Sequence, residues 1–75
     1  MKATTRAHDL MNTKGNELPS LALGYRNYLC KEVGGCMEVI FTAFCHYAVI
    51  IEGCEMDDTQ YEHDNAAQVW FENNR

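Results

Sequence analysis

The residues best suited to chemistry are four cysteines and two histidines: Cys30, Cys36, Cys45, His46, Cys54 and His63. Thiolates and imidazoles are the preferred ligands of structural zinc, and such sites usually include two ligands separated by two to four residues. Here successive cysteines lie six, nine and nine positions apart. The spacing therefore predicts no metal site and no cofactor, and the cysteines are interpreted as small buried side chains. A zinc-binding domain is the weakest alternative retained.

A cysteine nucleophile and a carboxylate site are the other candidates for chemistry. Cys54 could meet His63 if the C-terminal segment folds back over it, but acidic neighbours disfavour the reactive thiolate. The acids between residues 57 and 64 could hold a hard cation, but they lack the glycine and the spacing of a calcium-binding loop. We therefore expect a protein that is not an enzyme and has no catalytic residues.

Charge is divided unevenly along the 75-residue chain, which has 6 basic and 11 acidic residues. Residues 1–31 contain five of the basic residues, whereas residues 32–74 contain nine acids and neither lysine nor arginine. Such a surface repels nucleic acid, because phosphate binding requires cationic side chains. It favours a basic surface on another protein, where electrostatic steering speeds association. The simpler interpretation is that the acids only keep a small protein soluble.

Length and hydropathy limit where the chain can reside. The uncharged run of residues 39–51 is shorter than the roughly 20 apolar residues that span a membrane. Residues 1–16 are polar and lack the apolar region of a secretory signal. A cytoplasmic location with reduced thiols is therefore expected. We interpret residues 1–16 as a polar arm, in which Ala3–Met11 could form a short helix if something holds it, and residues 17–75 as one domain.

Two helices are predicted from apolar spacing. The first covers Leu21–Val33, with Ser20 as its N-cap and Gly34 at its end. Gly24 within it indicates a close contact with a sheet. The second covers about Thr59–Asn73, where acids precede the helix and favour its positive N-terminal end.

Three short strands are predicted between the helices: Met37–Ala43, Tyr47–Ile51 and Cys54–Met56. The first alternates apolar and mixed positions, and Glu52-Gly53 has the composition of a two-residue hairpin turn. No turn residue separates the first two strands, so one long bent strand is an alternative. The expected fold class is α+β: a small three-stranded antiparallel sheet flanked by two helices.

Two partner-binding surfaces follow from this fold. Acids and aromatic side chains around the second helix form the first, since tyrosine and tryptophan are common anchors of protein interfaces. Its residues are Glu52, Glu55, Asp57, Asp58, Tyr61, Glu62, Asp64 and Trp70. The second is the half-apolar sheet face that the helices leave bare. Its residues are Ile40, Thr42, Phe44 and Ile50.

The expected function is therefore non-enzymatic protein binding. The chain would act as an inhibitor or regulator that covers a basic surface of a nucleic-acid-binding protein, without binding nucleic acid or membrane itself. By analogy of size and charge alone, such proteins occur among the anti-defence proteins of phages and mobile elements, including anti-CRISPR proteins. The alternative is a small structural or regulatory homodimer with no basic partner.

Overall fold

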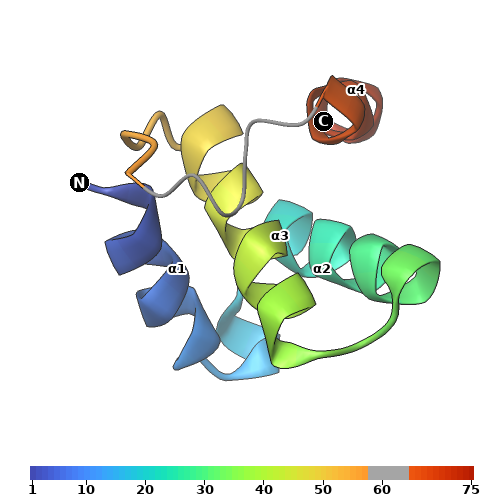
Figure 1. The fold of residues 1–75 in the computed structure, drawn as a ribbon, viewed down its shortest axis with the longest axis horizontal. Helices are drawn as coiled ribbons and strands as arrows, with labels where there is room; N and C mark the ends of the chain where they lie inside the picture. Colours follow the sequence, from blue (N-terminus) through green and yellow to red (C-terminus); the bar gives the residue numbers. More distant parts are fainter. Residues whose placement is uncertain (58–64) are drawn as a thin grey trace.

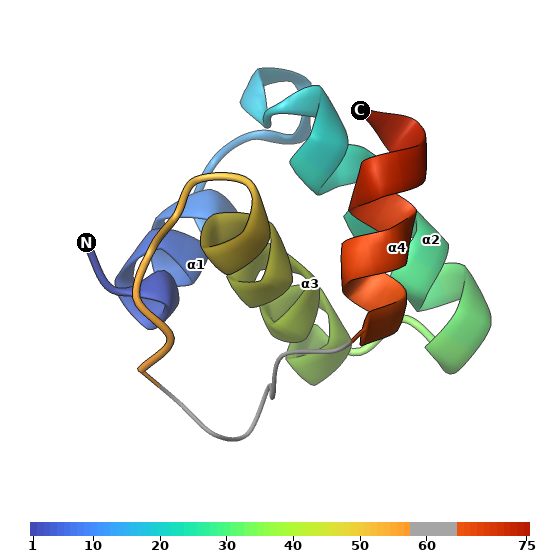
Figure 2. The ribbon, with the colours of Figure 1, turned by 90° about the horizontal axis from the view of Figure 1, so that it is seen from above.

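The computed structural model describes residues 1–57 and 65–75 and is helical (Figure 1). Its elements in chain order are α1 (Ala3–Met11), the 3₁₀ turn η1 (Gly15–Glu17), α2 (Ser20–Val33), α3 (Met37–Ile50) and α4 (Asn65–Asn74). Helix α3 lies in the middle, with α1 packed on one side and α2 on the other. Seen from above, α4 lies over α2 and also contacts α3 (Figure 2).

The prediction of an α+β fold is wrong. In the described ranges the only extended pairing is a single parallel bridge between Lys2 and Glu55. Residues expected to form the first two strands instead form one continuous helix, α3. No turn residue occurs near Phe44, and the chain does not reverse there. The element that continues through this position is a helix and not the long bent strand of the alternative interpretation.

Burial explains why α3 resembled strands. Six consecutive residues, 43–48, are buried, because α1 covers one side of the helix while α2 and α4 cover others. A helix enclosed on most sides is largely apolar and loses the one-sided pattern of a surface helix. A short apolar run of this kind cannot be assigned to strand or helix from periodicity alone. Tertiary packing then outweighs the strand preference of its β-branched and aromatic residues.

The expected hairpin turn at Glu52-Gly53 is the end of α3. Gly53 has a φ of 71°, so a glycine with positive φ is indeed required at this position. The Cys54 amide donates to the Ala48 carbonyl oxygen at 3.0 Å and reverses the chain direction. The reversal therefore follows a helix and does not join two strands.

The first predicted helix is confirmed as α2, which begins one residue earlier than expected. Ser20 is its first helical residue, so the N-cap is Pro19 and the prediction of a serine cap is wrong. Gly34 follows the helix with a φ of 112°. Gly24 does mark a close contact, but with α4: a Cβ placed there would lie 3.3 Å from Cη2 of Trp70.

The N-terminal residues contribute to the core. Ala3, Ala7 and Leu10 are buried on one side of α1, at the spacing of successive helical turns, and α1 packs against α3. The segment of residues 52–57 runs along the start of α1, where the Ala3 amide donates to the Glu55 carbonyl oxygen at 2.9 Å. The packing against α3 and the backbone bonds to Glu55 therefore hold α1 in place.

The C-terminal helix is described from Asn65 to Asn74. Its predicted start at Thr59, with caps at Asp57, Asp58 or Thr59, falls largely on residues outside the described ranges. Phe71 is buried in the core, whereas Trp70 is half-buried at the contact with α2. The described residues form no sheet, so both adjacent rings lie against helices: Phe71 in the core and Trp70 at the edge beside α2.

Candidate functional site

Polar residues follow a regular spacing along the otherwise apolar helix α3. Glu38, Thr42 and His46 are each four positions apart. Residues four apart lie above one another on the same side of a helix, so these three form a polar stripe. All three line the same hollow beside α2.

Helix α2 presents a complementary stripe at the same spacing. Tyr25, Leu29 and Val33 are four positions apart and face α3. The Tyr25 hydroxyl lies 3.1 Å from Nδ1 of His46, within hydrogen-bond distance. Tyr25 is 2% exposed and His46 is 5% exposed, so this pair lies at the buried end of the two stripes.

A hollow of about 270 Å³ lies beyond this pair, and we refer to it as the α2–α3 hollow. Its lining residues are Leu29, Val33, Glu38, Val39, Thr42 and His46. The two helices supply apolar walls, the exposed Glu38 side chain stands at the rim, and the His46 ring lies at the inner end. The hydrogen bond to Tyr25 fixes the orientation of this ring.

The geometry of the hollow favours binding over acid–base catalysis. Glu38 and His46 are eight residues apart on one helix, which separates them by about 12 Å along the axis at a rise of 1.5 Å per residue. A carboxylate and an imidazole at that separation cannot exchange a proton directly, which requires hydrogen-bond distance. The hollow can instead surround an apolar group, with the Glu38 carboxylate and the Thr42 hydroxyl able to accept hydrogen bonds from a donor attached to it.

A second concave surface, the α2–α4 groove, lies between Tyr28 and the exposed side of α4. It has a volume of about 420 Å³ and is lined by Tyr28, Asn65, Ala66, Val69, Trp70, Asn73 and Asn74. The Tyr28 and Trp70 rings stack at its base, with centroids 5.9 Å apart and planes inclined by 29°. Trp70, which the sequence predicted as a partner contact, is therefore accessible at an edge of the core.

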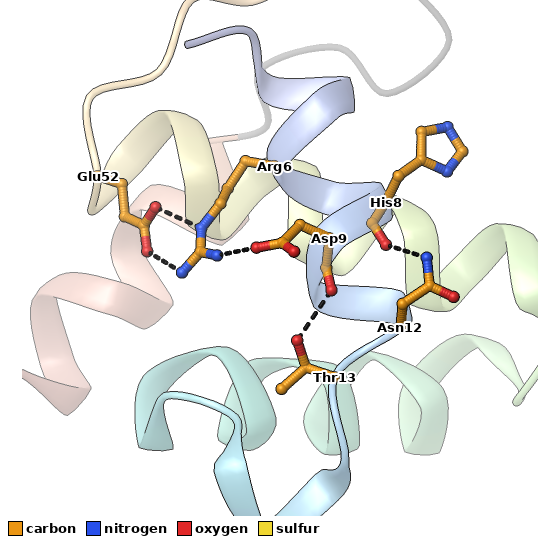
Figure 3. A network of polar contacts seen from close by, with 6 residues as sticks. All are labelled: Arg6, His8, Asp9, Asn12, Thr13 and Glu52. Carbon is orange, nitrogen blue, oxygen red and sulfur yellow. Dashed lines mark hydrogen bonds and ion pairs between the residues drawn. The ribbon is translucent and has the colours of Figure 1, made fainter.

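The acidic side chains predicted to bind a partner are partly used within the fold. The Glu52 carboxylate accepts two hydrogen bonds from Arg6, from Nε at 2.7 Å and from Nη2 at 3.0 Å (Figure 3). Arg6 also donates from Nη1 to Asp9 at 2.6 Å. The Asp57 carboxylate accepts from the Thr4 amide at 3.1 Å and from the Thr4 hydroxyl. Both acids therefore hold helix α1.

The same pair shifts the pKa values around it. The hydrogen bonds from Arg6 hold the pKa of Glu52 below its ordinary value, and a hydrogen bond from Tyr47 adds to this effect. The hydrogen bond to Glu52 likewise raises the pKa of Arg6. Burial, followed by the negative charge of Glu52, raises the pKa of Tyr47. These shifts belong to a structural cluster at the end of α3.

Of the other acidic and aromatic residues predicted to bind a partner, the structure describes only some. Glu55 is exposed, and only its backbone is bonded to the N-terminal residues. Four residues of this predicted surface lie outside the described ranges: Asp58, Tyr61, Glu62 and Asp64.

The predicted bare sheet face does not exist as one surface. Phe44 is buried, and Ile40, Thr42 and Ile50 are half-buried. Adjacent helical residues are about 100° apart, so Ile40 and Phe44 share one side of α3 while Thr42 lies on another. Only Thr42 of this set lines the α2–α3 hollow.

No disulfide joins the four cysteines, all of which lie in the described part of the chain. Among residues 1–57 and 65–75, no group of three or more histidine, cysteine or acidic side chains is placed to hold a metal ion. None of the helices formed by these residues has the length and apolar character needed to cross a membrane.

Comparison with known proteins gave no match. No family model fits the sequence, and neither the curated proteins nor the solved structures include a significant relative.

Proposed function

We propose that this chain is a non-enzymatic protein-binding module that covers a basic surface of another protein. One observation carries the proposal: within the described part of residues 32–74, four exposed glutamates form no ion pair with another described residue, and no lysine or arginine is present. These glutamates are Glu32, Glu38, Glu55 and Glu72. Their charge is available to a partner, whereas Glu52 and Asp57 are bonded to α1.

The concave surfaces support the same function. The α2–α4 groove presents Tyr28 and Trp70, and aromatic side chains of this kind often carry much of the binding energy of an interface. Exposed Val33 and Met37 add apolar contact area where α2 meets α3. Acidic charge beside aromatic and aliphatic anchors suits a protein surface better than nucleic acid, which requires cations.

The proposal is tested by capture with a matched control. The immobilised chain is exposed to cell lysate at low and high salt, beside a variant with Glu32, Glu38, Glu55 and Glu72 all changed to glutamine. We expect basic proteins on the wild-type chain only, and their release at high salt, because salt screens exposed charges. Partners that bind both chains equally, or that resist salt, would contradict the proposal.

Light scattering of the pure protein distinguishes the proposed binding module from the alternative of a homodimer. The proposal predicts a monomer, and a stable dimer with no salt-sensitive partner would favour the alternative. A cytoplasmic location and an anti-defence role are consistent with the proposed function, and both stay predictions.

A further inference from the structure

We propose that the α2–α3 hollow is a binding site for one arginine side chain, supplied by the basic partner. The inference rests on the proposed function and adds a contact to it. The hollow combines apolar walls with a carboxylate at the rim, and this combination matches the two parts of an arginine side chain.

The volume of the hollow favours a single side chain. Its 270 Å³ lies below the range of about 300–1,000 Å³ typical of pockets for small molecules and cofactors. Leu29 and Val33 from α2 and Val39 from α3 form the walls. Arginine buries its aliphatic stem along such surfaces while its charged end reaches a polar group.

The charge at the rim fits the guanidinium group. Glu38 is exposed, and its side chain forms no ion pair with any other described residue. The described residues that line the hollow include no lysine or arginine. A carboxylate in this setting can accept two parallel hydrogen bonds from a guanidinium, as Glu52 does from Arg6 elsewhere in this chain.

Polar atoms beyond the rim add further contacts. The Thr42 hydroxyl oxygen, one helical turn from Glu38, can accept a hydrogen bond from the same guanidinium. The His46 ring closes the inner end of the hollow and is held there by Tyr25. Because these groups are already positioned, binding an arginine would require little rearrangement of the chain.

The direct test uses NMR chemical shifts of the ¹⁵N-labelled chain. The probe is N-acetyl-arginine methylamide at millimolar concentration, and the matched neutral probe is N-acetyl-citrulline methylamide, which has the same length without the charge. We expect shifts at Leu29, Val33, Thr42 and His46 with the arginine probe. The Glu38→Gln variant should bind it about fivefold more weakly, as expected for one exposed ion pair.

The Glu17→Gln variant is the control, because it removes an exposed acid that lies outside both the hollow and the four glutamates of the proposed function, and it should bind the arginine probe as the wild type does. Absence of shifts at the hollow, equal shifts from citrulline, or equal loss in both variants would overturn the inference.

A second arm separates this inference from the proposed function. If a basic partner binds the wild-type chain and Glu38→Gln with equal affinity, the arginine site is wrong and the proposed function stands. If the arginine probe binds the hollow but no basic partner is captured, the arginine site stands and the proposed function is wrong.

Discussion

Arg6 and Glu52, 46 positions apart in the chain, form a two-pronged ion pair with distances of 2.7 Å and 3.0 Å. The pair joins the basic N-terminal part of the chain to the acidic part. Together with the bonds from Thr4 to Asp57, it fixes α1 against the end of α3. Part of the charge asymmetry visible in the sequence therefore serves the fold.

Replacing Glu52 by glutamine should lower the free energy of unfolding by about 1 kcal/mol at neutral pH, since a two-pronged pair has better geometry than most exposed ion pairs. Chemical denaturation of the wild type and Glu52→Gln measures this difference. Glu72→Gln, an exposed change on α4, is the matched control and should have little effect. Equal losses in the two variants would contradict the role of the pair.

The stabilisation by Glu52 should also depend on pH. Because the folded-state pKa of Glu52 lies below its ordinary value, the unfolded chain binds a proton first as the pH falls. The difference in stability between wild type and Glu52→Gln is therefore complete above the ordinary pKa of about 4.3 and disappears as the pH falls through the folded-state pKa. A difference that grows on acidification would show that the sign of the shift is wrong.

Replacing Asp57 by alanine should loosen α1. The Thr4 amide belongs to the first turn of α1, where no bond within the helix is available, and the helix has no side-chain cap of its own. Loss of a capping side chain costs about 1 kcal/mol. Hydrogen exchange should accelerate in residues 3–11 of Asp57→Ala. The control Glu55→Ala keeps its backbone bonds, and faster exchange in both variants would refute the capping role.

Replacing Tyr25 by phenylalanine should destabilise the protein by about 1–2 kcal/mol, because it removes a buried hydrogen bond to His46 while keeping the ring. Tyr28→Phe is the control, since that side chain is 40% exposed. Thermal or chemical unfolding measures both. If the two variants unfold alike, the Tyr25–His46 hydrogen bond does not contribute to stability.

Helix α4 should depend on Phe71. This side chain is fully buried and contacts the Tyr25 and Tyr47 rings at centroid distances of 4.8 Å and 6.2 Å. Phe71→Ala should cost about 3 kcal/mol or more, as large cavities in cores do. Val69→Ala on the same helix is the control, because Val69 is 53% exposed and surface changes usually alter stability by less than about 0.5 kcal/mol.

The sequence predicted α2 well because that helix keeps an apolar side and ends at a glycine. It failed for α3 because the run from Ala43 to Ala48 is buried without interruption, so the polar residues Glu38, Thr42 and His46 do not form a solvent-exposed side that contrasts with an apolar one. The uncharged run of thirteen residues was itself informative, since strands usually have four to eight residues and helices at least ten. Length could therefore have corrected the assignment.

The candidate site was missed because the residues of α3 were predicted to form strands. Interpreted as a strand, α3 places Glu38 and Thr42 on a half-solvated face with Phe44. Interpreted as a helix, it places Glu38, Thr42 and His46 in one stripe facing α2. The roles of Glu52 and Asp57 could not be predicted, because their partners Arg6 and Thr4 are distant in sequence. Such pairings depend on the tertiary arrangement of the helices.

The central claim is that exposed glutamates bring this chain to a basic protein surface. The decisive measurement is the dissociation constant of the purified partner, determined from about 0.05 to 0.5 M salt, a range over which the screening length shortens several-fold. We predict weaker binding as salt rises, and a smaller salt dependence when Glu32, Glu38, Glu55 and Glu72 are changed to glutamine. A dissociation constant that is independent of salt, and equal for the two chains, would contradict the claim.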